Sequence, residues 1–161
     1  MTNLNPYILK FNEIDLTNIP QVGGKNASLG EMIMNLTDKG IRVPEGFATT
    51  AQAYWDFLDA NDLRRQLQNV LNQLDTKTYG NLDEISTKAR QLILDHPFPE
   101  QIVIAISDAY LNFCSESGIS GEVAVRSSAT AEDLPNASFA GQQETYLNVT
   151  GAEEVIKACQ K

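Results

Sequence analysis

The sequence contains few of the residues that small secreted or metal-binding domains depend on. Its 161 residues include two cysteines, Cys114 and Cys159, which form no CxxC pair, and one histidine, His96. This scarcity argues against a disulfide framework, a structural zinc site and a histidine-based catalytic triad. The chain is instead long enough to bury a hydrophobic core without such cross-links.

Basic residues are also in the minority. Lys and Arg number 12 against 21 Asp and Glu, so the formal net charge is −9. A general nucleic-acid-binding protein needs a basic surface that neutralises phosphates, so this composition argues against nucleic acid as a partner. With 42% hydrophobic and 20% charged residues, the chain has the composition of a folded globular domain rather than that of a disordered segment.

Long hydrophobic runs are absent as well. The longest purely aliphatic run, Ile102–Ile106, is far too short to span a bilayer. Residues 1–6 contain neither the basic nor the apolar region of a secretory signal peptide. We therefore expect a cytoplasmic protein that has no membrane partner.

Helical periodicity dominates the middle of the chain, and β-prone segments lie on either side of it. Apolar residues at helical spacing predict helices that begin at Asn26 and after Thr50, that cover 63–74 and 82–93, that run from Pro99 to about Gly118, and that cover 152–161. Strands are predicted at 7–11, 123–127 and 144–149, with an extended segment or strand at 41–47. Because the central helices have no evident task beyond packing, we look for chemistry at the two ends.

Three finer expectations follow from local signals. Ser28 and Glu31 have the spacing of a capping box near the start of the first long helix, and Thr50 is placed to cap the next one. Tyr54 and Trp55 on that next helix are expected in the core. The last helix reaches residue 161 without a stop signal, which favours a fragment of a longer protein.

The segment Gly23-Gly24-Lys25 directly precedes the first long helix. Two glycines let the backbone approach a ligand closely, and a helix start offers free N–H groups and the positive end of the helix dipole. A lysine at this place could neutralise phosphate oxygens, although the spacing of a Walker A loop is absent. The alternative interpretation is a glycine turn before a helix, with Lys25 in solvent.

Arg126 ends an apolar strand, and a long segment of small and hydroxyl residues, 127–141, follows it. An arginine with apolar neighbours usually has a partner, which is either a phosphate or a carboxylate elsewhere in the chain. Loops of this length without secondary structure are often functional, and this one could close over an anionic ligand. An internal ion pair for Arg126 and an ordinary surface loop are the alternatives.

Four segments taken together resemble a known family. They are VGGKNASLGEM at 22–32, VPEGFATT at 43–50, VAVRSSATAEDLP at 123–135 and SFAGQQETYLNV at 138–149. In this order they look like the N-terminal nucleotide-binding region of the phosphoenolpyruvate synthase family, to which pyruvate phosphate dikinases and rifampicin phosphotransferases are related. The resemblance runs from about Tyr7 to the last residue.

The resemblance implies an α+β fold of the ATP-grasp type, helix-rich with a small sheet, of which residues 1–161 would form the N-terminal subdomain only. By the same resemblance Lys25 and Arg126 contact ATP phosphates, and Gly141, Thr145 and Tyr146 line the nucleotide site. It implies no catalytic acid or base and no metal ligand in this chain. The carboxylates that hold Mg²⁺ would lie outside it, as would its partners, the phosphohistidine and pyruvate-binding domains.

The implied enzyme is a phosphotransferase with paired acceptors, a pyruvate, water dikinase. Such an enzyme converts ATP, pyruvate and water to AMP, phosphoenolpyruvate and phosphate through a phosphohistidine, in the service of gluconeogenesis. The fragment alone would be inactive. The ATP-binding region of a rifampicin phosphotransferase and a stand-alone nucleotide-binding regulatory module are the alternatives.

Overall fold

The fold is α+β, with helices predominating over three small antiparallel sheets in the part of the chain that the computed structural model describes, residues 6–118, 120–130, 133–134, 137–138 and 144–161. The helices are α1 (Ile19–Val22), α2 (Gly24–Leu36), α3 (Ala51–Ala60), α4 (Leu63–Leu71), α5 (Leu82–Leu94), α6 (Glu100–Ser117) and α7 (Ala152–Gln160). The strands are β1 (Ile8–Lys10), β2 (Phe47–Thr49), β3 (Glu122–Arg126), β4 (Asp133–Leu134), β5 (Ala137–Ser138) and β6 (Thr145–Thr150). Short 3₁₀ turns cover Phe11–Glu13, Leu16–Asn18 and Thr37–Lys39.

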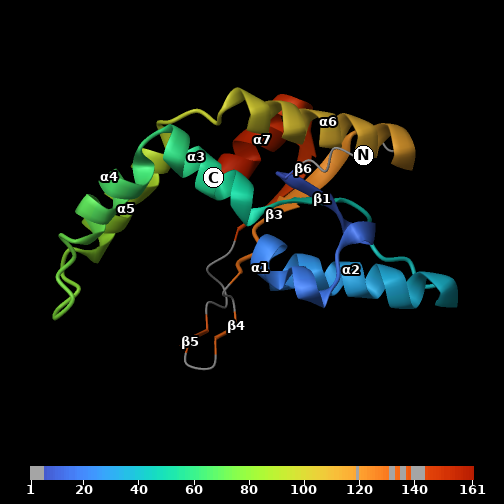
Figure 1. The fold of residues 1–161 in the computed structure, drawn as a ribbon, viewed down its shortest axis with the longest axis horizontal. Helices are drawn as coiled ribbons and strands as arrows, with labels where there is room; N and C mark the ends of the chain where they lie inside the picture. The colour runs from blue at the N-terminus through green and yellow to red at the C-terminus, as the bar shows by residue number, and fades with distance from the viewer. Residues whose placement is uncertain (1–5, 119, 131–132, 135–136, 139–143) are drawn as a thin grey trace.

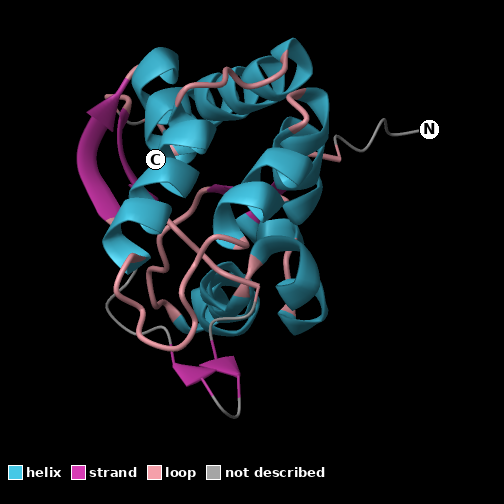
Figure 2. Cartoon of the chain, turned by 90° about the vertical axis from the view of Figure 1, so that its left-hand side faces the viewer, coloured by secondary structure: helices cyan, strands magenta, loops and turns pink. Residues whose placement is uncertain are grey.

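The elements form a central body with two projections (Figure 1). Helices α6 and α7 lie beside the sheet formed by β3 and β6, and α1 and α2 lie below them in this view. Helices α4 and α5 pack on each other and extend to the left as an arm. Strands β4 and β5 pair with each other and stand apart from the helices (Figure 2).

Two of the sheets pair strands that are separated by long stretches of sequence. β1 pairs with β2 from Ile8 opposite Thr49 to Lys10 opposite Phe47. β3 pairs with β6 from Glu122 opposite Thr150 to Arg126 opposite Thr145. A bulge interrupts this second ladder, and Asn148 in it has a φ of 58°, a conformation that asparagine tolerates well.

Two clusters of buried side chains hold these elements together. The large cluster joins residues of α3, α4, α6 and α7, and its members are Ala53, Phe57, Leu58, Leu63, Ile102, Ile106, Tyr110 and Val155. The small cluster lies around the start of α2 and consists of Ile14, Val22, Ala27 and Ala48. Tyr110 also donates a hydrogen bond from its hydroxyl to the Gly121 carbonyl at 2.6 Å, which ties α6 to the start of β3.

The predicted helices and the strands near 7–11, 123–127 and 144–149 are confirmed in position. Thr50 caps α3, since its side chain accepts a hydrogen bond from the Ala53 N–H. Gly118 ends α6 in the left-handed conformation. The extended segment at 41–47 becomes a strand only from Phe47, because Pro44 and Gly46 precede it.

Two of the finer expectations are wrong. Helix α2 begins at Gly24, two residues before the expected start, so Ser28 lies inside the helix and cannot cap it. Tyr54 and Trp55 are 49% and 43% exposed rather than buried, because Ala53, Phe57 and Leu58 form the buried face of α3. The Arg64 guanidinium instead covers the Trp55 ring, with its carbon 4.3 Å from the ring centroid.

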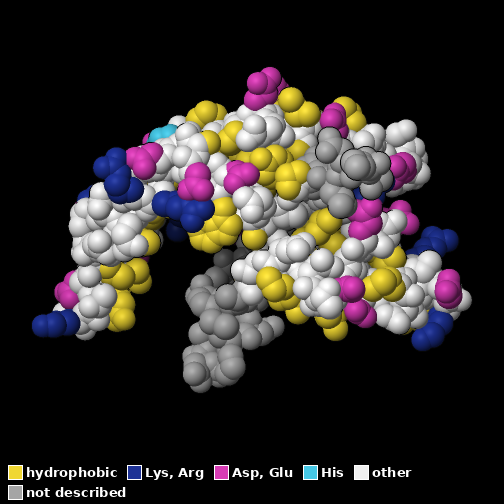
Figure 3. Space-filling model, in the orientation of Figure 1, with side chains coloured by type: hydrophobic (Ala, Val, Ile, Leu, Met, Phe, Trp, Pro, Cys, Tyr) yellow, Lys and Arg dark blue, Asp and Glu magenta, His cyan; other side chains and the backbone are white. Residues whose placement is uncertain are grey.

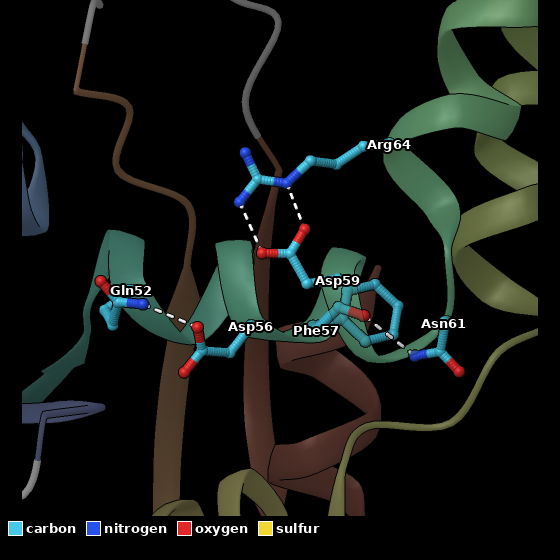
Figure 4. Close-up of polar contacts among 6 residues, drawn as sticks. All are labelled: Gln52, Asp56, Phe57, Asp59, Asn61 and Arg64. Atoms are coloured by element: carbon cyan, nitrogen blue, oxygen red, sulfur yellow. Dashed lines mark hydrogen bonds and ion pairs between the residues drawn. The ribbon is translucent and has the colours of Figure 1, made fainter.

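The turn between α3 and α4 shows how these surface groups are held (Figure 4). The Arg64 side chain pairs with the Asp59 carboxylate, and its second hydrogen bond to that group is 2.8 Å long. The Asn61 side chain donates to the Phe57 carbonyl at 3.0 Å and so closes the end of α3. These contacts join residues that are close in sequence and fix the direction in which α4 leaves α3.

Charged side chains do not gather into one basic surface on the face shown in Figure 3. Lys and Arg side chains are scattered over both ends of the molecule, and acidic side chains lie among them. Within the described ranges, none of the helices combines the length and the apolar character needed to cross a membrane.

Candidate functional site

A sharp turn between α1 and α2 carries the first candidate residue. Gly23 has a φ of 80° and a ψ of 164°, a conformation that side chains disfavour, and α2 starts at the next residue. Lys25 is half-buried in the first turn of α2. The Asn26 side chain donates to the Val22 carbonyl at 2.9 Å, so the turn is closed by its own residues.

The segment that follows β3 packs directly against this turn. The Gly24 N–H donates to the Ala129 carbonyl at 3.2 Å, and the Asn26 N–H donates to the Ser128 hydroxyl at 3.4 Å, across 102 residues of sequence. A Cβ on Gly23 would lie 2.4 Å from the Ser128 oxygen and 2.7 Å from the Ala129 carbonyl oxygen. Gly23 therefore allows close approach of the protein's own backbone, and two N–H groups expected to be free at this helix start already have acceptors.

Arg126 and Thr145 lie opposite each other at the end of the β3–β6 ladder. Both side chains are exposed, and because they form a cross-strand pair they lie on the same face of the sheet. The Ser127 N–H donates to the Glu144 carbonyl at 3.4 Å and extends the pairing by one residue. Among the described residues, no hydrogen bond or ion pair holds the Arg126 guanidinium, so the alternative of an internal ion pair receives no support from these residues.

Tyr146 lies on the other face of this sheet. It is paired with Val125, which packs against the large cluster, and it is half-buried. Its hydroxyl donates to the Glu144 carboxylate, and this hydrogen bond raises the pKa of Tyr146. The Lys161 ammonium lies 5.7 Å from the centroid of the Tyr146 ring, within reach of a cation–π interaction.

A groove of about 530 Å³ runs between β6 and α7. All six residues of β6 line it, together with Glu154, Lys157, Ala158 and Lys161. Thr145 and Tyr146 are thus in one groove, whereas Lys25 and Arg126 do not line it; the segments that carry these two residues meet at the hydrogen bond between Asn26 and Ser128. Of the four predicted site residues that the structure describes, only Thr145 and Tyr146 therefore line this groove.

Comparison with known families decides where this arrangement belongs. Residues 19–161 match the family described as the pyruvate phosphate dikinase AMP/ATP-binding domain, and these residues include both the glycine turn and β6. The chain belongs to this family.

Curated relatives support the same placement. The chain is 52% identical over 159 residues to a phosphoenolpyruvate synthase of Synechocystis sp., and this match covers 96% of the chain and 19% of that protein. It is 51% identical over 153 residues to the phosphoenolpyruvate synthase of Neisseria meningitidis, a match that covers 94% of the chain and 19% of that protein. It is 45% identical over 154 residues to the phosphoenolpyruvate synthase of Escherichia coli, a match that covers 96% of the chain and 19% of that protein. The chain spans about a fifth of the length of the curated relatives it matches.

Part of the long segment expected as a loop lies outside the described residues, and so does Gly141. The described part contains β4 and β5, which pair with Asp133 opposite Ser138 and Leu134 opposite Ala137. The expectation of a long loop without secondary structure is therefore wrong for these four residues. Closure over an anionic ligand stays a prediction.

Metal binding in this AMP/ATP-binding domain was expected to depend on residues elsewhere. The described ranges contain no group of three or more His, Cys, Asp or Glu side chains that could hold a metal ion. The single histidine is engaged in structure, since its Nδ1 lies 2.7 Å from the Leu92 carbonyl and its own carbonyl accepts from the Gln160 side chain at 2.6 Å.

Sequence reasoning missed the contribution of Ser128 and Ala129 to the glycine turn. Both residues lie in the segment that was expected to be a loop, and nothing in their neighbourhood indicates a contact 102 residues away. The one available signal was the pair of glycines, which was interpreted as room for a ligand. The same pair of glycines is also compatible with close approach of another segment of the protein.

Proposed function

We propose that this chain is the ATP-binding portion of a phosphoenolpyruvate synthase and forms the N-terminal part of an ATP-grasp domain. The observation that supports this most directly is the contact between the Gly23-Gly24-Lys25 turn and the segment after Arg126, in a member of the AMP/ATP-binding family. This contact brings together the two segments that carry Lys25 and Arg126, the cationic residues that the motifs single out. ATP is the ligand, in keeping with the family.

Lys25 and Arg126 act on the phosphates of ATP. Lys25 lies in the first turn of α2, at the positive end of the helix dipole, and Arg126 is the exposed last residue of β3. Both side chains stabilise negative charge on the transferring phosphates rather than acting as an acid or a base. Gly141, Thr145 and Tyr146 line the remainder of the nucleotide site.

The complete enzyme transfers the βγ-diphosphate of ATP to a histidine on a separate domain and releases AMP. Water then removes one phosphate, and the remaining phosphoryl group passes to pyruvate on a third domain. Mg²⁺ would be held by carboxylates outside this chain and would neutralise charge on the ATP phosphates, in line with its preference for phosphate and carboxylate oxygens. Both other domains are the chain's partners in the cytoplasm, and neither nucleic acid nor a membrane takes part.

The reaction is tested by ³¹P NMR of the intact polypeptide that carries this chain, with Mg·ATP and pyruvate. We expect phosphoenolpyruvate, AMP and phosphate in equal amounts. If pyruvate gives no product while rifampicin leads to release of AMP and phosphate, the enzyme is a rifampicin phosphotransferase that uses the same ATP site. Binding of ATP without turnover of either acceptor would instead identify a regulatory module.

The roles of the two cations are tested by Lys25→Ala and Arg126→Ala in the same polypeptide. Each substitution should lower the rate of ATP-dependent histidine phosphorylation by roughly 10²–10³-fold, because one charge-stabilising group is lost from the transition state. Lys77→Ala and Arg90→Ala are matched controls, since they remove the same charges from exposed positions in and before α5. Near-normal rates in both site variants would remove Lys25 and Arg126 from the mechanism.

A further inference from the structure

Two hydrogen bonds at the start of α2 come from the residues on either side of Lys25 in the sequence. The N–H groups of Gly24 and Asn26, the residues before and after it, donate to Ala129 and Ser128. These acceptors follow Arg126 by three and two residues in the chain. The backbone that carries Lys25 is therefore joined to the backbone that carries Arg126 through one short bridge.

The bridge depends on close packing. Gly23 is buried, and a Cβ on it would approach the Ser128 oxygen, the Ser128 carbonyl carbon and the Ala129 carbonyl oxygen within 2.8 Å. The glycine conformation and the short serine side chain together bring the two segments to hydrogen-bond distance. The Ser128 hydroxyl thus accepts from a helix N–H in the way that an N-cap residue does, but it does so from a distant part of the sequence.

We propose that Ser128 is a positioning residue, which holds the Lys25 turn in register with Arg126 so that both cations act on one polyphosphate. This inference rests on the proposed function. Two groups that must meet the same ligand lose efficiency when either is displaced by about 1 Å. The flanking hydrogen bond from Gly24 to Ala129 uses only backbone atoms, so removal of the Ser128 hydroxyl loosens the bridge and leaves this backbone hydrogen bond in place.

A residue that merely stabilises the helix would behave differently. Loss of an ordinary cap lowers the free energy of unfolding and leaves the rate of the folded enzyme unchanged. Loss of a positioning contact lowers kcat in the folded enzyme, and it does so only while Lys25 is present. The dependence on Lys25 is the property that distinguishes the two roles.

The experiment is a double-mutant cycle in the intact polypeptide, with Ser128→Ala, Lys25→Ala and the double variant. The readouts are kcat and KM for ATP in AMP formation, together with the thermal midpoint. We expect Ser128→Ala to lower kcat about 10-fold, to lower the thermal midpoint by no more than about the 2–4 °C that loss of one cap-like hydrogen bond causes, and to change kcat less than about 2-fold in the Lys25→Ala background. Ser86→Ala is the matched control, since it removes a hydroxyl that also bonds to backbone, at the Asp83 carbonyl in α5.

The cycle separates failure of this inference from failure of the proposed function. If Lys25→Ala is slow but Ser128→Ala has the parent rate, or lowers kcat by the same factor in both backgrounds, Ser128 does not act through Lys25 and the inference is overturned. If Lys25→Ala and Arg126→Ala both keep the parent rate, the proposed phosphate contacts fail, and the positioning role falls with them.

Discussion

The two buried clusters are built from different kinds of residue. The large cluster contains long side chains such as Phe57, Leu63 and Ile102, which helices α3, α4 and α6 supply at regular spacing. The small cluster, around the start of α2, contains two alanines among its four residues. It depends on close contact between backbones, since a Cβ on Gly30 would lie 2.0 Å from the Ile14 carbonyl oxygen.

This difference separates the part of the molecule that supports the fold from the part that shapes the site. The large cluster removes much apolar surface from water and so contributes much of the free energy of folding. The small cluster contributes less apolar area but places Gly23, Lys25 and Ser128 within a few ångströms of one another. Substitutions should therefore affect stability most in the large cluster and should affect the site most in the small one.

Phe57→Ala should have the largest effect on stability. Phe57 is 1% exposed, and its ring meets that of Phe98 edge-on with the centroids 5.0 Å apart. Truncation leaves a cavity and removes this contact, so the free energy of unfolding should fall by about 3–5 kcal/mol. Urea denaturation measures it. Tyr54→Ala on the same helix, at a 49% exposed position, should cost less than about 1 kcal/mol, and equal losses at the two positions would contradict the assignment of the buried face.

The same contrast explains how much of the fold could be predicted from sequence. The helices of the large cluster follow from apolar residues at i, i+3 and i+4, and the ends at Thr50 and Gly118 follow from capping chemistry. Those signals lie within one turn of the residues they govern. Tyr54 and Trp55 were misplaced because aromatic character does not say which face of a helix a residue occupies.

The candidate site could be predicted only in part, for a related reason. Lys25 and Arg126 stand out as candidates because a glycine turn and an arginine after an apolar strand are unusual locally, and their contact with ATP stays a prediction. The bridge through Ser128 was not found, since the small cluster leaves no periodic pattern and the contact spans 102 residues. The start of α2 was placed two residues late for the same reason: Gly23 caps nothing with a side chain, and its conformation depends on a distant segment.

The adjacent glycines of the turn offer the sharpest test of the small cluster. Gly23→Ala should lower the free energy of unfolding by about 2–4 kcal/mol, because the φ of 80° is strained for alanine and the new Cβ meets Ser128 and Ala129. Gly24→Ala should change it by less than about 0.5 kcal/mol, since no atom lies within 4 Å of where that Cβ would be. Thermal and urea denaturation of both variants measure the difference. Equal tolerance at the two positions would mean that the segment after β3 does not press on Gly23.

Cys159 is expected to have the smallest effect on the free energy of unfolding, and it tests the edge of the large cluster. It packs against that cluster beside an apolar cavity, and burial raises the pKa of its thiol from about 9 to about 11. Because the folded state holds this proton more tightly than the unfolded state, the thiol favours folding below about pH 9, and this contribution is lost as the pH rises toward 11. At pH 9 the folded protein should therefore react with iodoacetamide at Cys159 about 50-fold more slowly than the urea-unfolded protein, in proportion to the thiolate fraction.

Peptide mass spectrometry follows the modification at Cys159 separately from that at Cys114, and Cys159→Ser supplies the blank. Equal rates in the folded and unfolded protein would show that solvent reaches the thiol, so that α7 does not close this side of the cluster.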